Sequence, residues 1–465
     1  MSSPTLLHNL FYKSLYILVI CLLLPSRLEA RQTTVDSIRA NPGRAGGIYL
    51  AYPVTHDSQV RFTPPPKGYE PFYVSHYGRH GSRYLISDND YLKVVRILDD
   101  AEKNGALTPL GLELKAKLDT IYTEACGLGG ELTPLGVRQH TDIARRLIKN
   151  NPQIFKGSPR VTANSTVVMR CAHSMFAFCN ALTKEAPWLD ISMGSAPRTM
   201  SYLNYHSEES NAHSGHNGLW YRPWQKFKAE KTTPGRLVAS IFSDPHYIES
   251  SIDPAEFMWD LYWITVDLQN METPIRLYTL FTDQELFDLW QVFNFNFYAC
   301  NSSYPYADGT ITDNAKNLVR NILETARAYI ASGENGATLR FGHDGNIIPL
   351  TALLQLDDCY AFVGDPRQLA SHYADYSISP MAANLQIIFY RTSKPSRNTG
   401  DILVKFLLNE KEIAFGGGTV PTAFPSSPYY RWSDVENKLT EILETPSRHY
   451  LPEKYRNANR YIERP

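Results

Sequence analysis

Five consecutive residues, Arg79, His80, Gly81, Ser82 and Arg83, have types and spacing that could do chemistry on phosphorus. The neutral imidazole of a histidine is a good nucleophile at mildly acidic to neutral pH. Two guanidinium groups beside it can hold a tetrahedral phosphate through charge-assisted hydrogen bonds. The segment therefore predicts attack of His80 on a phosphorus atom that Arg79 and Arg83 hold in place.

The residues before this segment favour a reactive loop over an exposed basic turn, which is the alternative for so short a motif. Residues 71–76 have the composition of a strand, and a proline-rich stretch at 64–66 bounds them. Open α/β sheets bind ligands in loops at the carboxyl ends of their strands. We therefore expect residues 79–83 to lie at such an end.

Four further segments lie at expected strand or helix boundaries. They are 130–139 (G-E-L-T-P-L-G-V-R-Q), 165–174 (S-T-V-V-M-R-C-A-H-S), 341–346 (F-G-H-D-G-N) and 381–385 (M-A-A-N-L). The second supplies Arg170 at a helix start, and the third supplies His343 and Asp344 directly after a strand. Phosphoryl transfer requires positive charge around three equatorial oxygens, and a proton donor to the leaving alkoxide helps by roughly 10²–10⁴-fold. The segments supply positive charge through Arg170 and a proton donor through Asp344.

The order and separation of R-H-G-x-R, L-T-x-x-G, S-T-x-x-x-R and H-D resemble those of the histidine acid phosphatases, branch 2 of the histidine phosphatase superfamily. The likeness covers residues 73–415. It implies that His80 is the nucleophile and forms a phosphohistidine, and that Asp344 is the general acid. It also implies a set of side chains that bind the phosphoryl oxygens, namely Arg79, Arg83, Arg170 and His343.

The resemblance implies a phosphoric monoester hydrolase that acts on small-molecule phosphate esters. Phytate, other inositol phosphates and sugar phosphates are the expected substrates. Family members with an H-A-E motif place the acid one residue later, where this chain has Gly345, so specificity for inositol polyphosphates does not transfer directly. The alternatives are a phosphoglycerate-mutase-like phosphotransferase and a non-catalytic protein that binds phosphorylated ligands. The H-D pair and the export-signal pattern of residues 1–30, described below, argue against the first. The presence of both His80 and Asp344 argues against the second.

Cofactor and metal sites are not expected. Six cysteines lack C-x-x-C spacing, which argues against a zinc site and leaves their disulfide pairing open. The loop-like spacing of His206, His213 and His216 with Glu208 and Glu209 matches no standard metal site.

Three further histidines are expected to be structural: His76 in its strand, and His140 and His173 on helices. Residues 221–231 interleave basic and aromatic side chains. If this segment faces the pocket, it attracts a polyphosphorylated substrate; the alternative, which we favour, is a solvated loop.

Composition and charge limit the partners. A chain of 465 residues with 43% apolar residues can form two domains, or one large domain with an insertion. A formal net charge of −1 argues against a general nucleic-acid binder, which needs a basic surface. Neither nucleic acid nor a stable protein partner is implied.

The first 30 residues have the pattern of an export signal. Lys13 precedes an apolar run at 15–24, followed by Pro25 and by Ala30 as a small residue for cleavage. The run is too short to span a bilayer comfortably. We therefore predict a signal peptide at 1–30 and a periplasmic or secreted protein, with an uncleaved membrane anchor as the alternative.

Strands alternating with helices predict an α/β fold with a mainly parallel sheet and helices on both faces. The expected strands are 71–76, 160–163, 338–342, 385–390 and 403–408. The aromatic-rich and histidine-rich region 187–313 is predicted to be an inserted, mainly α-helical domain over the sheet. Residues 31–186 and 314–465 are then the phosphatase core.

Overall fold

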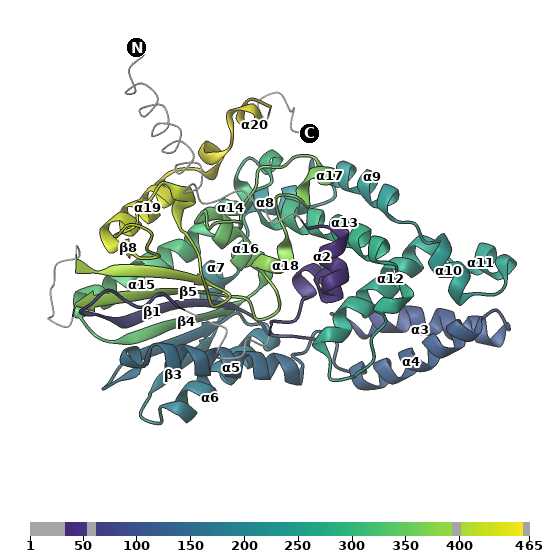
Figure 1. Ribbon diagram of the computed structural model, residues 1–465, viewed down its shortest axis with the longest axis horizontal. Helices are drawn as coiled ribbons and strands as arrows, with labels where there is room; N and C mark the ends of the chain where they lie inside the picture. The colour runs from purple at the N-terminus through teal and green to yellow at the C-terminus, as the bar shows by residue number, and fades with distance from the viewer. Residues whose placement is uncertain (1–32, 54–61, 393–400, 459–465) are drawn as a thin grey trace, which may run out of the picture. The chain divides into compact units, whose positions relative to one another are not determined.

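A mixed β-sheet with helices on both faces occupies the left half of the view in Figure 1. The computed structural model describes residues 33–53, 62–392 and 401–458. The strands in these ranges are β1 (Tyr69–Arg79), β2 (Arg160–Ser165), β3 (Ile191–Ser195), β4 (Gly336–Gly342), β5 (Asn384–Thr392), β6 (Leu403–Leu408), β7 (Lys411–Glu412) and β8 (Tyr430–Arg431). Their order is β3-β2-β4-β1-β5-β6-β7, and β8 pairs with β6. The predicted signal peptide lies outside the described residues.

Helices cover this sheet and extend beyond it. They include α3 (Asp88–Lys103), α4 (Pro109–Ala125), α5 (Pro134–Asn150), α6 (Met169–Glu185), α9 (Tyr221–Lys231), α10 (Gly235–Ile241), α12 (Pro254–Asp267), α13 (Asp283–Asn301), α15 (Lys316–Ser332), α16 (Asp344–Leu353), α18 (Asp375–Ile378) and α19 (Trp432–Glu444), together with the 3₁₀ segment η1 (Pro42–Tyr49). In the described ranges no helix is both long and apolar enough to cross a bilayer.

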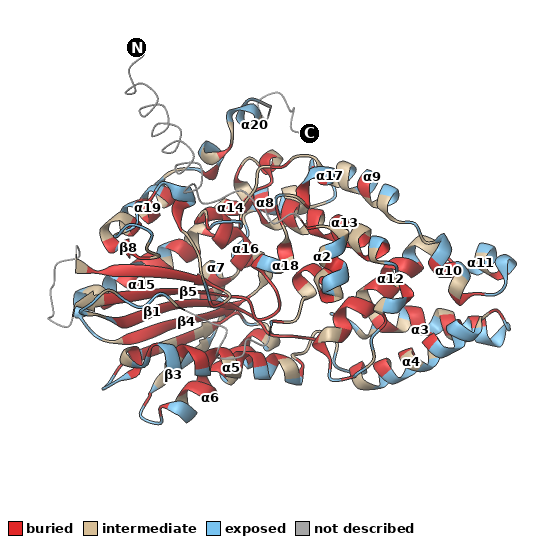
Figure 2. Cartoon of the chain, in the orientation of Figure 1, coloured by how far each residue is buried: buried red, intermediate tan, exposed pale blue. Residues whose placement is uncertain are grey.

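The predicted α/β class is confirmed. Strands β3, β2, β4 and β1 run parallel, whereas β5 pairs antiparallel with β1 and with β6. Side chains alternate between the two faces of the sheet, so Val74 packs with α5 and α6 while Tyr73 and Tyr77 pack with α15 and α16. Figure 2 shows the strands buried between these helical layers.

Helix starts follow the capping signals in the sequence. Thr108 and Thr133 each accept a hydrogen bond from the glycine amide three residues later, and proline occupies the first helical position of both α4 and α5. Both helices therefore begin where the T-P-L-G pattern predicts.

The helical packing extends beyond the predicted insertion at 187–313. Helices α3 and α4 share one hydrophobic cluster with α10, α12 and α13, although they precede that region in the chain. Residues 191–195, which lie within it, form β3 and pair with β2 in the sheet. The sequence does not show on which neighbours these helices pack, so the domain boundary itself stays a prediction.

Candidate active site

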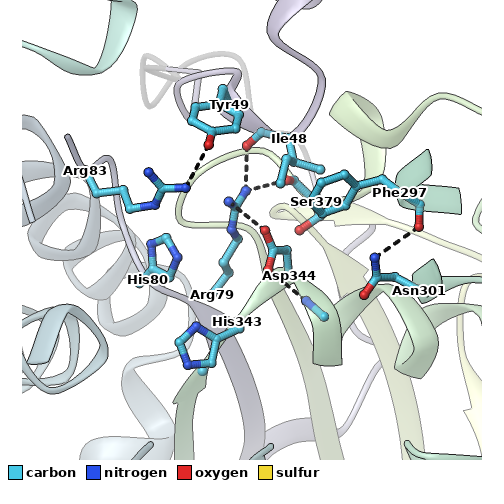
Figure 3. Close-up of polar contacts among 12 residues, drawn as sticks. Ile48, Tyr49, Arg79, His80, Arg83, Phe297, Asn301, His343, Asp344 and Ser379 are labelled. Carbon is cyan, nitrogen blue, oxygen red and sulfur yellow. Dashed lines mark hydrogen bonds and ion pairs between the residues drawn. The ribbon is translucent and has the colours of Figure 1, made fainter. Parts of the chain in front are cut away.

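The parallel strands bring three of the predicted segments to one edge of the sheet. In the register of β1 with β4, Arg79 pairs with Gly342, so His80 and His343 both follow directly at the strand ends. The amide of His80 donates to the carbonyl oxygen of Gly342 at 2.9 Å, and the imidazole centroids of His80 and His343 are 5.7 Å apart. Figure 3 shows His80 and Arg83 beside His343 and Asp344.

Arg79 is completely buried beneath this cluster. Its Nη1 donates to the carbonyl oxygens of Ile48 and Ser379 at 2.6 and 2.7 Å, and its Nη2 lies 3.0 Å from Oδ2 of Asp344. The two carbonyl groups fix the plane of the guanidinium group. The structure therefore pairs the first arginine of R-H-G-x-R directly with the aspartate of H-D.

Arg83 is held by an aromatic side chain that the sequence did not single out. Its Nη2 donates to the hydroxyl of Tyr49 at 3.1 Å, and its guanidinium carbon lies 4.9 Å from the centre of the Tyr49 ring. Its Nη1 donates to the carbonyl oxygen of Tyr84 at 2.7 Å. The fully buried carboxyl of Asp267 is a further electrostatic neighbour, and burial raises the pKa of Asp267 to about 7.

Arg170 lies in the first turn of α6 and is partly buried. Burial, followed by repulsion from Arg83, lowers its pKa. Among the described residues, the Nε atoms of Arg79, Arg83 and Arg170 are buried and have no hydrogen-bond partner. Buried donors are normally paired, so three such donors near one histidine are typical of a site that takes an anion.

His80 is buried, and a hydrogen bond shows which of its ring nitrogens carries the proton. A carbonyl oxygen only accepts, so Nδ1 donates to the Gly81 oxygen at 2.9 Å, and in the neutral ring Nε2 carries the lone pair. Burial holds the pKa of His80 well below its usual value, and the charges of Arg79 and Arg170 lower it further. Both effects favour the neutral imidazole of His80 over its protonated form.

His343 and Asp344 begin α16. His343 is the N-cap residue and Asp344 is the first helical residue. Nε2 of His343 lies 3.2 Å from the Thr166 hydroxyl, and burial lowers the pKa of His343 to about 4. Burial alone would raise the pKa of Asp344, but Arg79 and His343 outweigh it and the net pKa lies below the usual value.

Gly81 of the R-H-G-x-R motif and Gly136 of the L-T-x-x-G motif lie in close backbone contact. A Cβ atom at Gly81 would lie 2.6 Å from the carbonyl oxygen of Gly136, so the R-H-G loop and the start of α5 can approach only because both residues lack side chains. Thr133 reinforces this contact by donating its amide and its hydroxyl to the Ser82 carbonyl oxygen, at 2.9 and 3.1 Å. The L-T-x-x-G motif therefore supports the loop that carries His80.

The M-A-A-N segment holds the same loop from the other side. The amide of Arg79 donates to the Ala383 carbonyl oxygen at 2.7 Å, and the amide of Ala382 donates to the His80 carbonyl oxygen at 2.9 Å. Ala382 has a φ of 56°, in the left-handed region that non-glycine residues rarely adopt. The backbone at the nucleophile is thus fixed by contacts from three distant segments.

The profile of the histidine phosphatase superfamily (branch 2) matches residues 78–409. The chain belongs to this family. The resemblance predicted from the motifs is confirmed. No protein of the curated set matches the chain.

Solved structures share the fold at low identity. A multiple inositol polyphosphate phosphatase of Bifidobacterium longum, in complex with inositol hexasulfate, has a TM-score of 0.72 and 18% identity over 85% of this chain and 97% of that chain. The phytase from D. castellii has a TM-score of 0.62 and 16% identity over 90% of this chain and 89% of its own. Hafnia alvei phytase, in complex with myo-inositol hexakis sulphate, has a TM-score of 0.52 and 13% identity over 82% of this chain and 99% of that chain.

Among the other described histidines, two are structural, and His206 is an electrostatic neighbour of His343. His76 and His140 are buried against the Phe341 ring, and burial lowers the pKa of each to about 3. His173 is exposed on α6. No group of His, Cys, Asp or Glu that could hold a metal ion occurs in the described ranges, which include His206 and His213. The five cysteines described, Cys126, Cys171, Cys179, Cys300 and Cys359, are free thiols.

The basic segment 221–231 is helix α9 rather than a loop. Its lysines differ in their surroundings. Lys226 is exposed, Lys231 contacts Asp288 at 2.9 Å, and Lys228 lies 3.7 Å from Glu256.

We expect an activity optimum below pH 7 for an alkyl phosphate. His80 stays neutral as the pH falls because its pKa is well below the usual value, whereas Asp344, with its lowered pKa, loses its proton as the pH rises. In the free enzyme the protonated fraction of Asp344 falls about tenfold per pH unit above that pKa. A pH profile of kcat/KM for glucose 6-phosphate tests this, and equal values from pH 5 to 9 would contradict it.

Proposed function

We propose that this chain is a phosphomonoesterase that works through a phosphohistidine on His80. The observation that carries the proposal is the set of three buried, unpartnered guanidinium Nε donors near a neutral imidazole. The donors favour binding of an anion, and the imidazole has a lone pair at Nε2 that can attack phosphorus. A phosphate ester satisfies both at once.

In the first step, Nε2 of His80 attacks phosphorus on the side opposite the leaving alcohol. The N–P bond forms as the P–O bond to the alcohol breaks, and the proton of Asp344 moves to the departing oxygen. Asp344 lies 3.0 Å from Arg79 and keeps 21% of its side chain exposed, so it borders the space where that oxygen departs. A bound phosphate dianion raises the pKa of Asp344 toward the value an acid needs.

In the second step, water attacks the phosphohistidine from the side the alcohol has left. Asp344 takes a proton from that water, the N–P bond breaks, and inorganic phosphate and neutral His80 are regenerated. Arg79, Arg83, Arg170 and His343 hold the equatorial oxygens through both steps. The start of α16 adds the partial positive charge of a helix N-terminus.

Phosphate esters of inositols and sugars are the substrate classes we propose. Structures that share the fold hold inositol hexasulfate, myo-inositol hexakis sulphate or phosphate. We also propose export, which rests on the pattern of residues 1–30 alone.

Phosphate release from a panel of esters tests the proposed function. The panel is phytate, glucose 1-phosphate, 2,3-bisphosphoglycerate and p-nitrophenyl phosphate, at pH 5 with EDTA present. Release from at least one ester despite the chelator supports a metal-independent phosphatase. Phosphoryl transfer within the bisphosphoglycerate pool without net release would support the transferase alternative, and binding without turnover would support the non-catalytic one.

A further inference from the structure

A cavity of about 490 Å³ is lined in part by Tyr49, which also contacts Arg83 of the proposed catalytic cluster. Its apolar walls are mainly aromatic and come chiefly from Tyr49, Trp224, Trp259, Trp263, Phe293 and Phe297. Its volume lies within the range of small-molecule sites, about 300–1,000 Å³. The cavity can therefore hold the part of a substrate that extends beyond the phosphate.

Two aromatic residues connect the cavity to the cluster. The guanidinium carbon of Arg83 lies 4.9 Å from the centre of the Tyr49 ring, and Nη2 of Arg83 donates a hydrogen bond to the Tyr49 hydroxyl at 3.1 Å. Phe297 accepts a hydrogen bond at its carbonyl oxygen from Asn301, whose side chain would lie 3.3 Å from a Cβ at Gly345. Figure 3 shows Tyr49 beside Arg83, and Phe297 on the Asp344 side of the cluster. Both Tyr49 and Phe297 line the cavity.

The charged residues of the cavity lie on the helix faces that line it. On α12, Glu256, Trp259, Asp260 and Trp263 follow the i, i+3, i+4, i+7 pattern of one helix face. On α9, Trp224 and Lys228 are four residues apart, and on α3, Asp90 and Lys93 are three apart.

Both lysines of the cavity already have carboxylate partners. Lys93 lies 3.4 Å from Asp260, and Lys228 lies 3.7 Å from Glu256. The ammonium group of Lys228 also lies over the rings of Trp224 and Trp259, at 5.6 and 5.1 Å from their centres. The third carboxylate, Asp90, accepts a hydrogen bond from the Ser87 amide but has no cation among the cavity residues.

The cavity thus has three carboxylates against two lysines, and each lysine is paired. Additional phosphate groups on a substrate would meet like charge without a free cation to offset it. Hydroxyl groups, in contrast, can donate hydrogen bonds to carboxylates, and the aliphatic faces of a sugar ring can pack on indole rings.

We infer that this cavity selects phosphomonoesters of an uncharged, polyhydroxylated ring, namely sugar monophosphates, and discriminates against polyphosphorylated rings. The inference rests on the proposed function and names the substrate class for that same site. The aromatic walls bind the ring, the carboxylates orient its hydroxyl groups, and the charge of the cavity excludes further phosphates.

Substrate competition measures this selectivity directly. At pH 6.5 we expect kcat/KM for glucose 6-phosphate to exceed that for inositol hexakisphosphate by about tenfold or more. In the variant Glu256→Gln/Asp260→Asn we expect the ratio to shift toward inositol hexakisphosphate by about tenfold, because two like charges are removed and Lys93 and Lys228 are released.

A matched control is available on α4. Glu113 and Asp119 are exposed carboxylates that also pair with lysines, so Glu113→Gln/Asp119→Asn makes the same change in net charge outside the cavity. We expect the control to leave the substrate ratio unchanged. A wild-type preference for inositol hexakisphosphate, or equal shifts in the two double variants, would overturn the inference.

The aromatic wall has its own test. Phe297→Ala is expected to raise KM for glucose 6-phosphate about tenfold while leaving KM for the ring-free glycerol 2-phosphate unchanged. Equal changes for both substrates would contradict a ring-binding role.

Binding separates failure of this inference from failure of the proposed function. In His80→Ala, tryptophan fluorescence reports ligand binding without turnover, since Trp224, Trp259 and Trp263 line the cavity. Tighter binding of glucose 6-phosphate than of inositol hexakisphosphate supports the inference even if no ester is hydrolysed. Tighter binding of the hexakisphosphate overturns it even if hydrolysis proceeds.

Discussion

Replacing His80 with alanine is expected to reduce phosphate release by about 10⁴-fold or more, the scale seen when a covalent nucleophile is removed from an enzyme. The reason is that no other described side chain places a neutral imidazole nitrogen among the three arginines. His343 is the nearest second imidazole, but its Nε2 contacts Thr166. Steady-state hydrolysis of p-nitrophenyl phosphate at pH 5 measures the loss.

His173→Ala is the matched control for this variant. His173 is exposed on α6, three residues after Arg170, so the same substitution there removes an imidazole close to the site in sequence but outside the cluster. We expect activity within twofold of wild type, on the scale of an ordinary surface substitution. A His80→Ala protein that folds normally and keeps a tenth of the activity would contradict the nucleophile assignment.

The second large effect is a loss in Asp344→Asn that depends on the leaving group. Alkyl phosphates should lose about 10²–10⁴-fold in kcat, because their alkoxide must be protonated as it departs. p-Nitrophenyl phosphate should lose about tenfold or less, since p-nitrophenolate leaves without a proton. The comparison of kcat for glucose 6-phosphate and for p-nitrophenyl phosphate on the same variant measures the difference.

Asparagine keeps the shape of the side chain and an oxygen that can accept from the Gly345 amide, now 2.8 Å from the Asp344 carboxylate. It removes the charge that faces Arg79 at 3.0 Å, so some effect on phosphate binding is expected for every substrate. KM for p-nitrophenyl phosphate reports that shared effect. Equal losses in kcat for both substrates would remove Asp344 from the acid role.

The convergence of the motifs at one sheet edge was predictable from the sequence. Arg79 ends β1 and Gly342 ends β4, and both strand ends are visible as apolar runs that stop at polar, glycine-containing loops. Parallel strands share one carboxyl edge, so His80 and Asp344 had to lie near one another once these strands were paired.

The contacts that orient the arginines were not predictable. Arg79 is held by the carbonyl oxygens of Ile48 and Ser379, and a backbone acceptor leaves no signature in residue type. Tyr49 lies in a proline- and glycine-rich lead-in that matches no motif, and only the fold brings it to Arg83. Strand β3 was missed because its short sequence, I-S-M-G-S, lacks a continuous apolar run and lies exposed at the sheet edge.

Direct detection of the phosphorylated enzyme tests the central claim most sharply. The protein is mixed with p-nitrophenyl phosphate, quenched in alkali within milliseconds, and digested for mass spectrometry, because a phosphohistidine survives base and is lost in acid. We expect a phosphoryl group on the peptide that contains His80, stable in base, labile in acid and missing from His80→Ala. Turnover at the normal rate with no phosphorylated peptide, or with the phosphoryl group on any other residue, would contradict it.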